Sequence, residues 1–301
     1  MQIIRPVTVT NAVLSSTTVP ENDYAEWNSA STYAVGNRVI VTGTVHKIFE
    51  SLTAGNINQN PVGGDGTQWL TLGATNRWKA FDQKIADQVV RVGSINYVFI
   101  PNSNVTSVAF FNLAGTSVNV TVTDPTAGEV YNSTISLIDN ENVIDWFTYF
   151  FDPAVQQDTA TFFDMPPYFG AEISVTISTA AGEDAKVGQI VFGALTSLGV
   201  TTYGTSISIE DFSRKETDAF GNFIVVQRAF SQLADFDVQF ETTDARRIQR
   251  TLSELRATPA VYVGSIDPAY GTTLYGFYRR FDLTLETPSL SFGSIEVEGL
   301  T

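Results

Sequence analysis

The chain has 301 residues, of which 43% are hydrophobic and 16% are charged. It carries 17 basic and 32 acidic residues, a formal net charge of −15, and no cysteine. Such acidity repels phosphate backbones, so we expect no nucleic-acid partner. The absence of cysteine excludes disulfides, thiolate metal ligands and cysteine nucleophiles. The length predicts two or three domains, because single cores stop growing near roughly 250–300 residues.

Residues 1–21 read as an extended N-terminal arm. Their β-branched and alternating stretches favour extended backbone, while Pro6 predicts an edge strand or an unpaired tail. The arm either adds to the sheet edge of a neighbour or is a loosely ordered terminus, and the residues favour neither. No signal-peptide block is present and no run approaches the ~18 apolar residues of a membrane span, so we expect no membrane insertion.

Residues 22–82 form a compact unit rich in turns and aromatic residues. Three of the four tryptophans of the chain lie here. Two short expected strands, Arg38–Thr42 and Thr44–Glu50, flank Gly43 and predict a hairpin. Because a unit near 60 residues has little core, most of its aromatic side chains are expected to pack inside.

Residues 83–193 alternate apolar and polar side chains in several short runs. Turn sequences at 125–128 and 180–182 separate some of these runs. Short strands at regular spacing predict an antiparallel β-sandwich. The expected strands are Asn96–Ile100, Val105–Leu113, Ser117–Thr123, Glu129–Leu137 and Ala171–Thr179.

Residues 194–301 predict a further β domain with one α-helix over 244–257. Thr243 or Asp244 is placed to cap the helix, apolar residues recur at helical spacing, and Pro259 ends it. The expected strands are Thr205–Ile209, Asn222–Arg228, Asp235–Glu241, Ala260–Val263, Thr273–Phe277, Asp282–Glu286 and Ser294–Val297. The whole chain therefore predicts a mainly β fold with a small N-terminal β module, an antiparallel β-sandwich and a C-terminal β domain with one α-helix.

The residue types that catalysis needs are scarce. His46 is the single histidine and no Gly-x-Ser-x-Gly elbow occurs, so neither a serine triad nor a histidine-rich zinc site is predicted. Carboxylates within 139–145, including Glu141, and at 183–184 would allow glycoside hydrolysis, but such groupings arise by chance in an acidic chain. The 139–145 segment lacks the glycine turn of a calcium loop. We expect no enzyme activity, no metal and no cofactor.

The densest aromatic run is Trp146-Phe-Thr-Tyr-Phe-Phe151. As a strand it presents aromatic rings on both faces, because alternate side chains point to opposite sides. Burial between a sheet and a covering layer is the favoured interpretation. The alternative is a subunit interface, where aromatic anchors dominate the binding energy. Trp146, Tyr149 and Phe151 are the interface candidates.

The predicted C-terminal helix carries a cluster of arginines. Arg246, Arg247 and Arg250 lie on it, followed by Arg256. Either they form a solvated face, or they dock on an acidic patch of a neighbouring subunit. In a chain this acidic, that neighbour can be another copy. The two interpretations are equally supported.

Glycines and aromatic residues of the 22–82 unit fall in a characteristic order: Trp27-Asn-Ser-Ala-Ser-Thr-Tyr33, Val35-Gly36-Asn-Arg-Val39, Gly43-Thr-Val45-His46, Pro61 and Gln68-Trp69-Leu-Thr-Leu72-Gly73. This order resembles the small chitin-binding-type (family 5/12-like) carbohydrate-binding modules, in which tyrosine usually stands at the place of His46. The resemblance implies glycan binding. Sugar rings stack on flat aromatic faces while polar neighbours take the hydroxyls. The expected sugar-binding residues are Tyr24, Trp27, Asn28, Tyr33, His46, Gln68 and Trp69.

Further segments resemble bacteriophage tail proteins that carry such a module in front. They are Thr75–Asp82, Lys186–Gly193, Leu198–Gly204, Ile209–Ser213, Phe220–Phe223, Val226–Phe230 and Leu255–Pro259. The resemblance implies a structural component of a tail tip or baseplate that is assembled in the host cytoplasm and located in the virion tail.

The partners that this resemblance implies are other tail or baseplate proteins, further copies of the chain and a host-surface glycan. The C-terminal β domain is the expected place of tail attachment and oligomerisation. The alternatives are a stand-alone polysaccharide-binding protein and a glycan hydrolase appendage.

Overall fold

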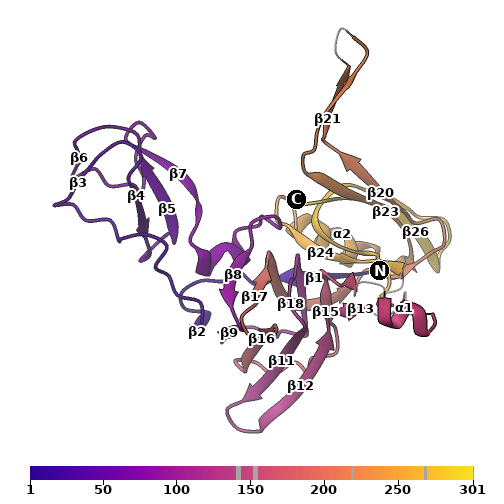
Figure 1. The fold of residues 1–301 in the computed structure, drawn as a ribbon. Helices are drawn as coiled ribbons and strands as arrows, with labels where there is room; N and C mark the ends of the chain where they lie inside the picture. Colours follow the sequence, from indigo (N-terminus) through magenta and orange to yellow (C-terminus); the bar gives the residue numbers. More distant parts are fainter. Residues whose placement is uncertain (140–143, 152–154, 218–219, 268–269, 301) are drawn as a thin grey trace.

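The computed structural model describes residues 1–139, 144–151, 155–217, 220–267 and 270–300. The fold is mainly β, as predicted, and its main element is a ten-stranded antiparallel sheet that curls on itself (Figure 1). Its strands in spatial order are β15 (Ala160–Phe162), β10 (Ser107–Phe111), β18 (Gln189–Ser197), β1 (Gln2–Pro6), β24 (Ala260–Val263), β25 (Thr273–Thr284), β26 (Leu290–Gly299), β23 (Phe230–Glu241) and β19 (Val200–Thr201), with β20 (Ser206–Asp211) also paired to β23.

The N-terminal strand β1 lies in the middle of this sheet, between β18 and β24. Ile3 and Ile4 are fully buried in different hydrophobic clusters, one on each face of the sheet. Gly193 of β18 permits the close approach of β1, because a Cβ there would collide with the carbonyl of Arg5. Pro6 only ends the strand, so its missing N–H leaves the interior of the ladder intact. This corrects the expectation of an edge strand or unpaired tail.

The large sheet also crosses the boundary expected between residues 193 and 194. That position falls inside β18, and the sheet takes strands from both sides of it. The sandwich and the helix-bearing region therefore share one sheet, with β1 between their strands.

A second, five-stranded antiparallel sheet packs against one end of the large sheet. The predicted sandwich core lies between them. Tyr97, Val120 and Ile177 of the second sheet meet Phe110 and Phe192 of the first in one buried cluster. The second sheet runs in the order β12 (Gly128–Ser136), β11 (Ser117–Asp124), β16 (Glu172–Ser178), β9 (Ile95–Phe99) and β2 (Leu14–Thr17), and a separate pair joins β8 (Val89–Val92) to β17 (Asp184–Val187).

Helix α2 (Ala245–Glu254) lies within the range 244–257 predicted for a helix and follows a 3-10 turn η2 (Thr242–Asp244). Its apolar side chains Ile248 and Leu252 pack against Phe236 and Ile295 of the large sheet. The expected strands 273–277 and 282–286 are parts of one long strand, β25, whose register shifts after Tyr278.

The N-terminal module is a small β unit beside the main body, at the left of Figure 1. The expected hairpin around Gly43 is present, although its second strand starts at Lys47. The 3-10 helix η1 (Asn76–Phe81) leads from the module into the sandwich. The module strands are β3 (Thr32–Tyr33), β4 (Arg38–Val41), β5 (Lys47–Ser51), β6 (Asn56–Ile57) and β7 (Trp69–Ala74).

The aromatic run forms a short helix, α1 (Trp146–Phe151), instead of the expected strand. Its rings are exposed, so the favoured interpretation of burial between layers is wrong. Aromatic residues favour strands only where their side chains pack against those of a neighbouring strand. In the described part of the chain no strand pairs with this run, whereas the N–H of Tyr149 bonds to the carbonyl of Asp145 at 3.1 Å. Strands β13 (Ile138–Asp139) and β14 (Val155–Gln156) pair with each other on either side of it, and Glu141 lies outside the described residues.

Strands β21 (Arg214–Thr217) and β22 (Phe223–Val226) form a β-hairpin. Within the described ranges these strands pair only with each other, and they continue β20 and β23 away from the body (Figure 1). Among the described residues, no helix is long and apolar enough to cross a membrane.

The central position of β1 predicts that Ile4→Ala lowers the free energy of unfolding by about 2–5 kcal/mol, because it removes buried methyl groups and leaves a cavity. Urea denaturation followed by circular dichroism measures the loss. Ile209→Ala on β20, where the side chain is exposed, is the matched control, with an expected change within about 0.5 kcal/mol. Equal effects at the two positions would contradict a central β1.

Candidate functional site

Two of the aromatic residues expected to bind sugar pack in or against the core of the N-terminal module, where Trp69 is buried and Tyr33 is half-buried beside it. Trp69 is only 5% exposed, and its indole N–H donates to the carbonyl of Gln59 at 3.0 Å. The ring of Tyr33 meets Trp69 edge to face, with centroids 5.2 Å apart. Its hydroxyl closes a loop by accepting from the N–H of Asn28 at 2.8 Å and donating to the carbonyl of the same residue at 3.2 Å. Both rings therefore serve the fold of the module.

The remaining members of the expected platform lie apart. Trp27 is half-buried against the same cluster, and the side chain of Gln68 accepts a hydrogen bond from Thr53. Tyr24 is exposed, but the guanidinium of Arg38 lies 5.8 Å from its ring centroid and donates to its hydroxyl at 3.0 Å. The exposed aromatic ring among the expected sugar-binding residues is thus Tyr24, with Asn28 as an exposed polar neighbour along the chain.

His46 belongs to the joint between the module and the sandwich. It stacks on Trp78 with ring centroids 4.1 Å apart, and its Nδ1 lies 2.8 Å from Oε1 of Glu21. The Glu21 carboxylate also accepts from the Thr75 hydroxyl at 2.7 Å and lies 3.5 Å from the Arg77 guanidinium. Because His46 and Glu21 are largely buried, these contacts brace the two parts of the chain. A sugar-stacking role for His46 conflicts with this position.

A cavity of about 340 Å³ adjoins this joint, and Asp82 is among its lining residues. One oxygen of Asp82 accepts the N–H of Lys84 at 3.0 Å, while the other is buried with no hydrogen-bond partner among the described residues. Burial raises the pKa of Asp82 to about 6.

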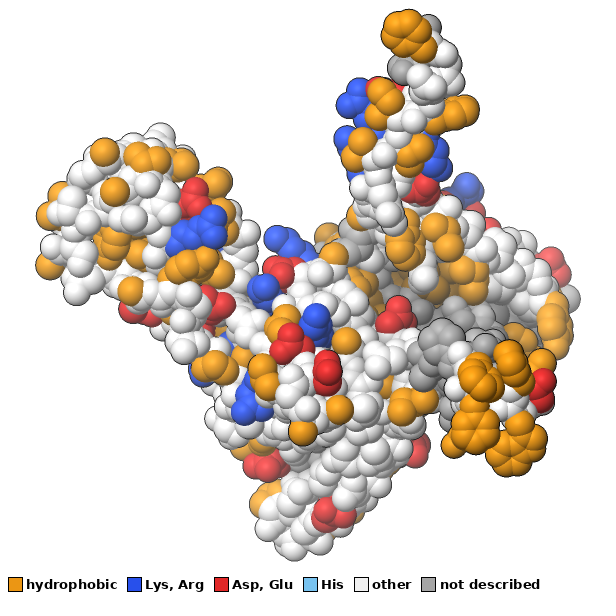
Figure 2. Space-filling view, viewed as in Figure 1, with side chains coloured by type: hydrophobic (Ala, Val, Ile, Leu, Met, Phe, Trp, Pro, Cys, Tyr) orange, Lys and Arg blue, Asp and Glu red, His pale blue; other side chains and the backbone are white. Residues whose placement is uncertain are grey.

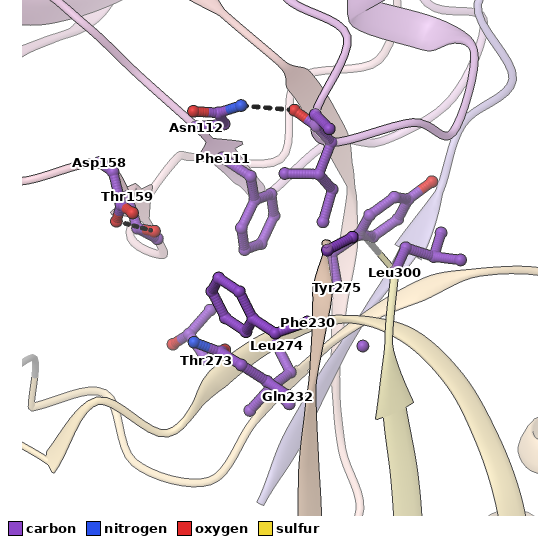
Figure 3. A pocket seen from close by; sticks show the side chains of 14 residues that line it. Phe111, Asn112, Asp158, Thr159, Phe230, Gln232, Thr273, Leu274, Tyr275 and Leu300 are labelled. Carbon is purple, nitrogen blue, oxygen red and sulfur yellow. Dashed lines mark hydrogen bonds between the residues drawn. The ribbon is translucent and has the colours of Figure 1, made fainter. Parts of the chain in front are cut away.

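A second cleft, of about 340 Å³, lies on the large sheet (Figure 3). Phe111 and Tyr275, whose ring centroids are 5.7 Å apart, line it together with Phe230. Asp158 is the one charged side chain among the described lining residues. Without a basic group this cleft disfavours anionic ligands, and it does not assemble the two carboxylates that glycoside hydrolysis requires.

One exposed apolar surface is the outer hairpin, which we define as residues 212–217 and 220–228. Phe223 is 79% exposed and Val225 is 63% exposed, and the other β22 side chains are exposed as well. Paired residues of a two-stranded ribbon share a face, so Lys215 lies beside Val225 and Thr217 beside Phe223. Isolated two-stranded hairpins are marginally stable in water, and contiguous exposed apolar side chains mark contact sites.

The second exposed apolar surface is the aromatic helix, which we define as α1. The described aromatic side chains are 61–78% exposed and contact one another, for example Phe147 and Phe151 with centroids 4.9 Å apart. They gather at the lower right of Figure 2, well apart from the outer hairpin at the top. A helix that is apolar all round is normally buried, so this element has the composition of a contact surface.

Acidic and basic residues are unevenly distributed along the chain. Residues 92–185, which include the aromatic helix, contain eleven acidic and no basic residues. Residues 211–228 contain three basic and three acidic residues, and Lys215 pairs with Asp211 at 2.7 Å while Arg214 pairs with Glu216 at 2.6 Å, so this segment carries no net charge.

The arginines of α2 are exposed but have partners within the chain. Arg247 lies 3.0 Å from the carboxylate of Asp244, and Arg250 lies 3.4 Å from Glu254. Arg246 is exposed beside them. Exposed pairs of this kind contribute little to stability. The geometry therefore fits the solvated face more directly than the docking surface.

The sequence predicts the outer hairpin only in part. Its strand over 222–228 is predicted, and four consecutive apolar residues, Phe223 to Val226, indicate apolar character on both faces. The residues of the cleft carry no local signal, because Phe111, Phe230 and Tyr275 come from distant parts of the chain.

Neither a scan against models of protein families nor a comparison with curated proteins finds a match for this chain. Among the described residues no group of three or more His, Asp or Glu side chains is placed to hold a metal ion.

The packing of the module predicts that Trp69→Ala destabilises it by about 3–5 kcal/mol, because a large buried ring is removed. Tyr24→Ala is the matched control, with an expected loss below about 1 kcal/mol from the exposed contact with Arg38. Urea denaturation followed by tryptophan fluorescence reports on the module, where Trp27 and Trp78 remain. Unchanged stability of the Trp69 variant would contradict its core position.

The raised pKa of Asp82 predicts that stability falls as pH rises from about 4 to about 6. Over this window the folded state holds the proton more tightly than the unfolded chain, whose aspartates have a pKa near 4. Asp82→Asn removes the charge, so its expected gain is about 1 kcal/mol at pH 7, after allowance for solvent screening, and close to none at pH 4.

Urea unfolding at the two pH values tests this expectation. The exposed Asp184→Asn is the control, and its effect is expected to stay within about 0.5 kcal/mol at both. An equal gain from Asp82→Asn at pH 4 and pH 7 would sink the explanation.

Proposed function

We propose that the protein is a structural subunit of a bacteriophage tail tip or baseplate. In this role it joins neighbouring subunits through the outer hairpin and the aromatic helix, and the N-terminal module faces the host surface, where it contacts glycans. The observation that carries the proposal is the exposure of apolar side chains on two elements that leave the body of the molecule.

Exposure on this scale favours an assembly subunit over an isolated protein. Single exposed apolar residues are ordinary on monomers, but contiguous patches mark interaction sites. Interfaces are enriched in Trp, Tyr and Phe, which are the residue types of α1. The hairpin gains a hydrophobic contact only when another surface covers it.

The sequence resemblances support the proposed tail location, and the arrangement of the parts is compatible with it. The N-terminal module lies at the left of Figure 1, away from the outer hairpin and the aromatic helix. Subunit contacts through the hairpin and the helix would thus leave the module accessible. Weak glycan binding would suffice there, because several copies in one particle bind with avidity.

The alternatives have less support from the geometry. A stand-alone polysaccharide-binding protein needs an assembled sugar platform, whereas Trp69 is buried in the module and Tyr33 is half-buried against it. A glycan hydrolase needs two carboxylates flanking the scissile bond. Among the described residues that line the cleft in Figure 3, Asp158 is the one carboxylate.

Labelling of particles tests the proposed function. Gold-coupled antibodies against the chain are expected to bind one end of the tail in electron micrographs of particles released by lysis. Antibodies against a major capsid protein serve as the positional control. Detection of the protein only in the particle-free supernatant would overturn the proposal.

A further inference from the structure

We propose that a cleft on the large sheet, which we call the loop cleft, binds an uncharged oligosaccharide. Its two walls are residues 199–205 on one side and residues 264–267 with 270–272 on the other. The inference rests on the proposed contact with glycans and adds a glycan site outside the N-terminal module. The loop cleft has a volume of about 740 Å³, which lies within the range of ~300–1,000 Å³ that is usual for ligand sites.

Both walls of the loop cleft are anchored in the large sheet. The first wall lies between β18 and β20 and includes β19, and the second follows β24. The hydroxyl of Thr201 donates to the carbonyl of Gly264 at 2.5 Å, so the walls are joined to each other before any ligand binds. A site that is formed in advance loses less conformational entropy when it takes up its ligand.

The two walls carry the same three residues, Tyr203-Gly-Thr205 on the first and Tyr270-Gly-Thr272 on the second. The central glycines have φ values of +119° and +56°, in the region that favours glycine. The side chain of Tyr203 is 100% exposed and that of Tyr270 is 60% exposed. Each wall thus presents an accessible aromatic ring on which a sugar ring can stack.

The hydroxyl groups that line the loop cleft include both hydrogen-bond acceptors and donors. The hydroxyl of Thr205 donates to the carbonyl of Thr202 at 3.2 Å, so its oxygen keeps lone pairs for an outside donor. The Ser265 hydroxyl accepts from the N–H of Asp267 at 3.2 Å, and the Thr272 hydroxyl accepts from the N–H of Ser265 at 2.8 Å. Each of these two hydroxyls keeps its own O–H for a ligand. Sugar hydroxyls donate and accept, so they match such a lining.

The charge of the loop cleft selects an uncharged ligand. Among the described lining residues Asp267 carries the one charged side chain, and none is lysine or arginine. The whole chain has a net charge of −15, so an anionic glycan would be repelled. Ile207 and Ile266 are exposed in the lining and offer apolar contact to the C–H faces of a sugar.

Calorimetric titration of the full chain tests this assignment. The probes are uncharged tetrasaccharides of glucose, of galactose and of N-acetylglucosamine, and a sulfated tetrasaccharide is the anionic comparison. The wild-type chain is expected to bind at least one uncharged probe with a Kd in the millimolar range or below, and to bind the sulfated probe more weakly.

Tyr203→Ala and Tyr270→Ala are each expected to raise this Kd about tenfold, because one stacking ring is lost, and the double variant is expected to abolish binding. Tyr203→Phe keeps the ring and is expected to stay close to the wild-type Kd. Both tyrosines are exposed, so the variants are expected to fold, and circular dichroism checks this. The matched control, Tyr24→Ala on the module, leaves the Kd of the loop cleft unchanged.

Three results would overturn the assignment: no binding of any uncharged probe, tighter binding of the sulfated probe, or binding that the double variant keeps and Tyr24→Ala loses. Any of them together with gold-labelled tails would remove the loop cleft as a glycan site and leave the proposed tail role standing. Unlabelled particles would remove the tail role itself, whatever the titrations give.

Discussion

Strand β1 pairs with β18 over residues 2–6 and with β24 over residues 2–4, and the rest of the body depends on this double pairing. Burial of an isoleucine side chain contributes roughly 1.5–3 kcal/mol, and Ile3 and Ile4 make that contribution on opposite faces of the sheet. Through β1, the strands of the sandwich and those of the C-terminal region become one curled sheet. That sheet is the frame that holds the outer hairpin and the aromatic helix at separate places.

The N-terminal module is attached in a different way. Its joint is built from polar and aromatic contacts, with Glu21 between His46, Thr75 and Arg77, and with Trp78 stacked on His46. The hydroxyl of Tyr97, buried in the sandwich core, donates to the carbonyl of Arg77 at 2.7 Å and ties η1 to the sandwich. Hydrogen bonds of this kind are directional, so the joint sets the orientation of the module more than its stability.

The sequence predicts the individual helices and strands better than it predicts which elements pair or pack beside them. Alternation reveals the sandwich strands, and the spacing of Ile248 and Leu252 with Pro259 reveals α2, because these signals are local. The place of β1 depends on partners at Leu195 and Val261, which no local pattern shows. The aromatic run misleads for the same reason, since its strand propensity has meaning only beside another strand.

The residues of the candidate site show the same difference between features that are visible in the local sequence and features that depend on distant contacts. The tryptophan and glycine order of the module is visible in the sequence, but whether a ring faces inward or outward depends on contacts such as that between Trp69 and Gln59. Apolar character of Phe223 to Val226 is visible too. Their exposure follows from the length of β20 and β23, which carry the hairpin beyond the sheet.

The central place of the first strand has a consequence for how the protein is made. Ile4 is synthesised well before its partners Leu195 and Val261, so the sheet can close only after residue 261 has been synthesised. Contacts this distant in sequence raise the contact order and slow folding. Until β18 and β24 are in place, both edges of β1 lack a partner strand, and unpaired strand edges are prone to aggregation. A chain that ends before β24 therefore leaves β1 without one of its two neighbours and cannot complete the large sheet.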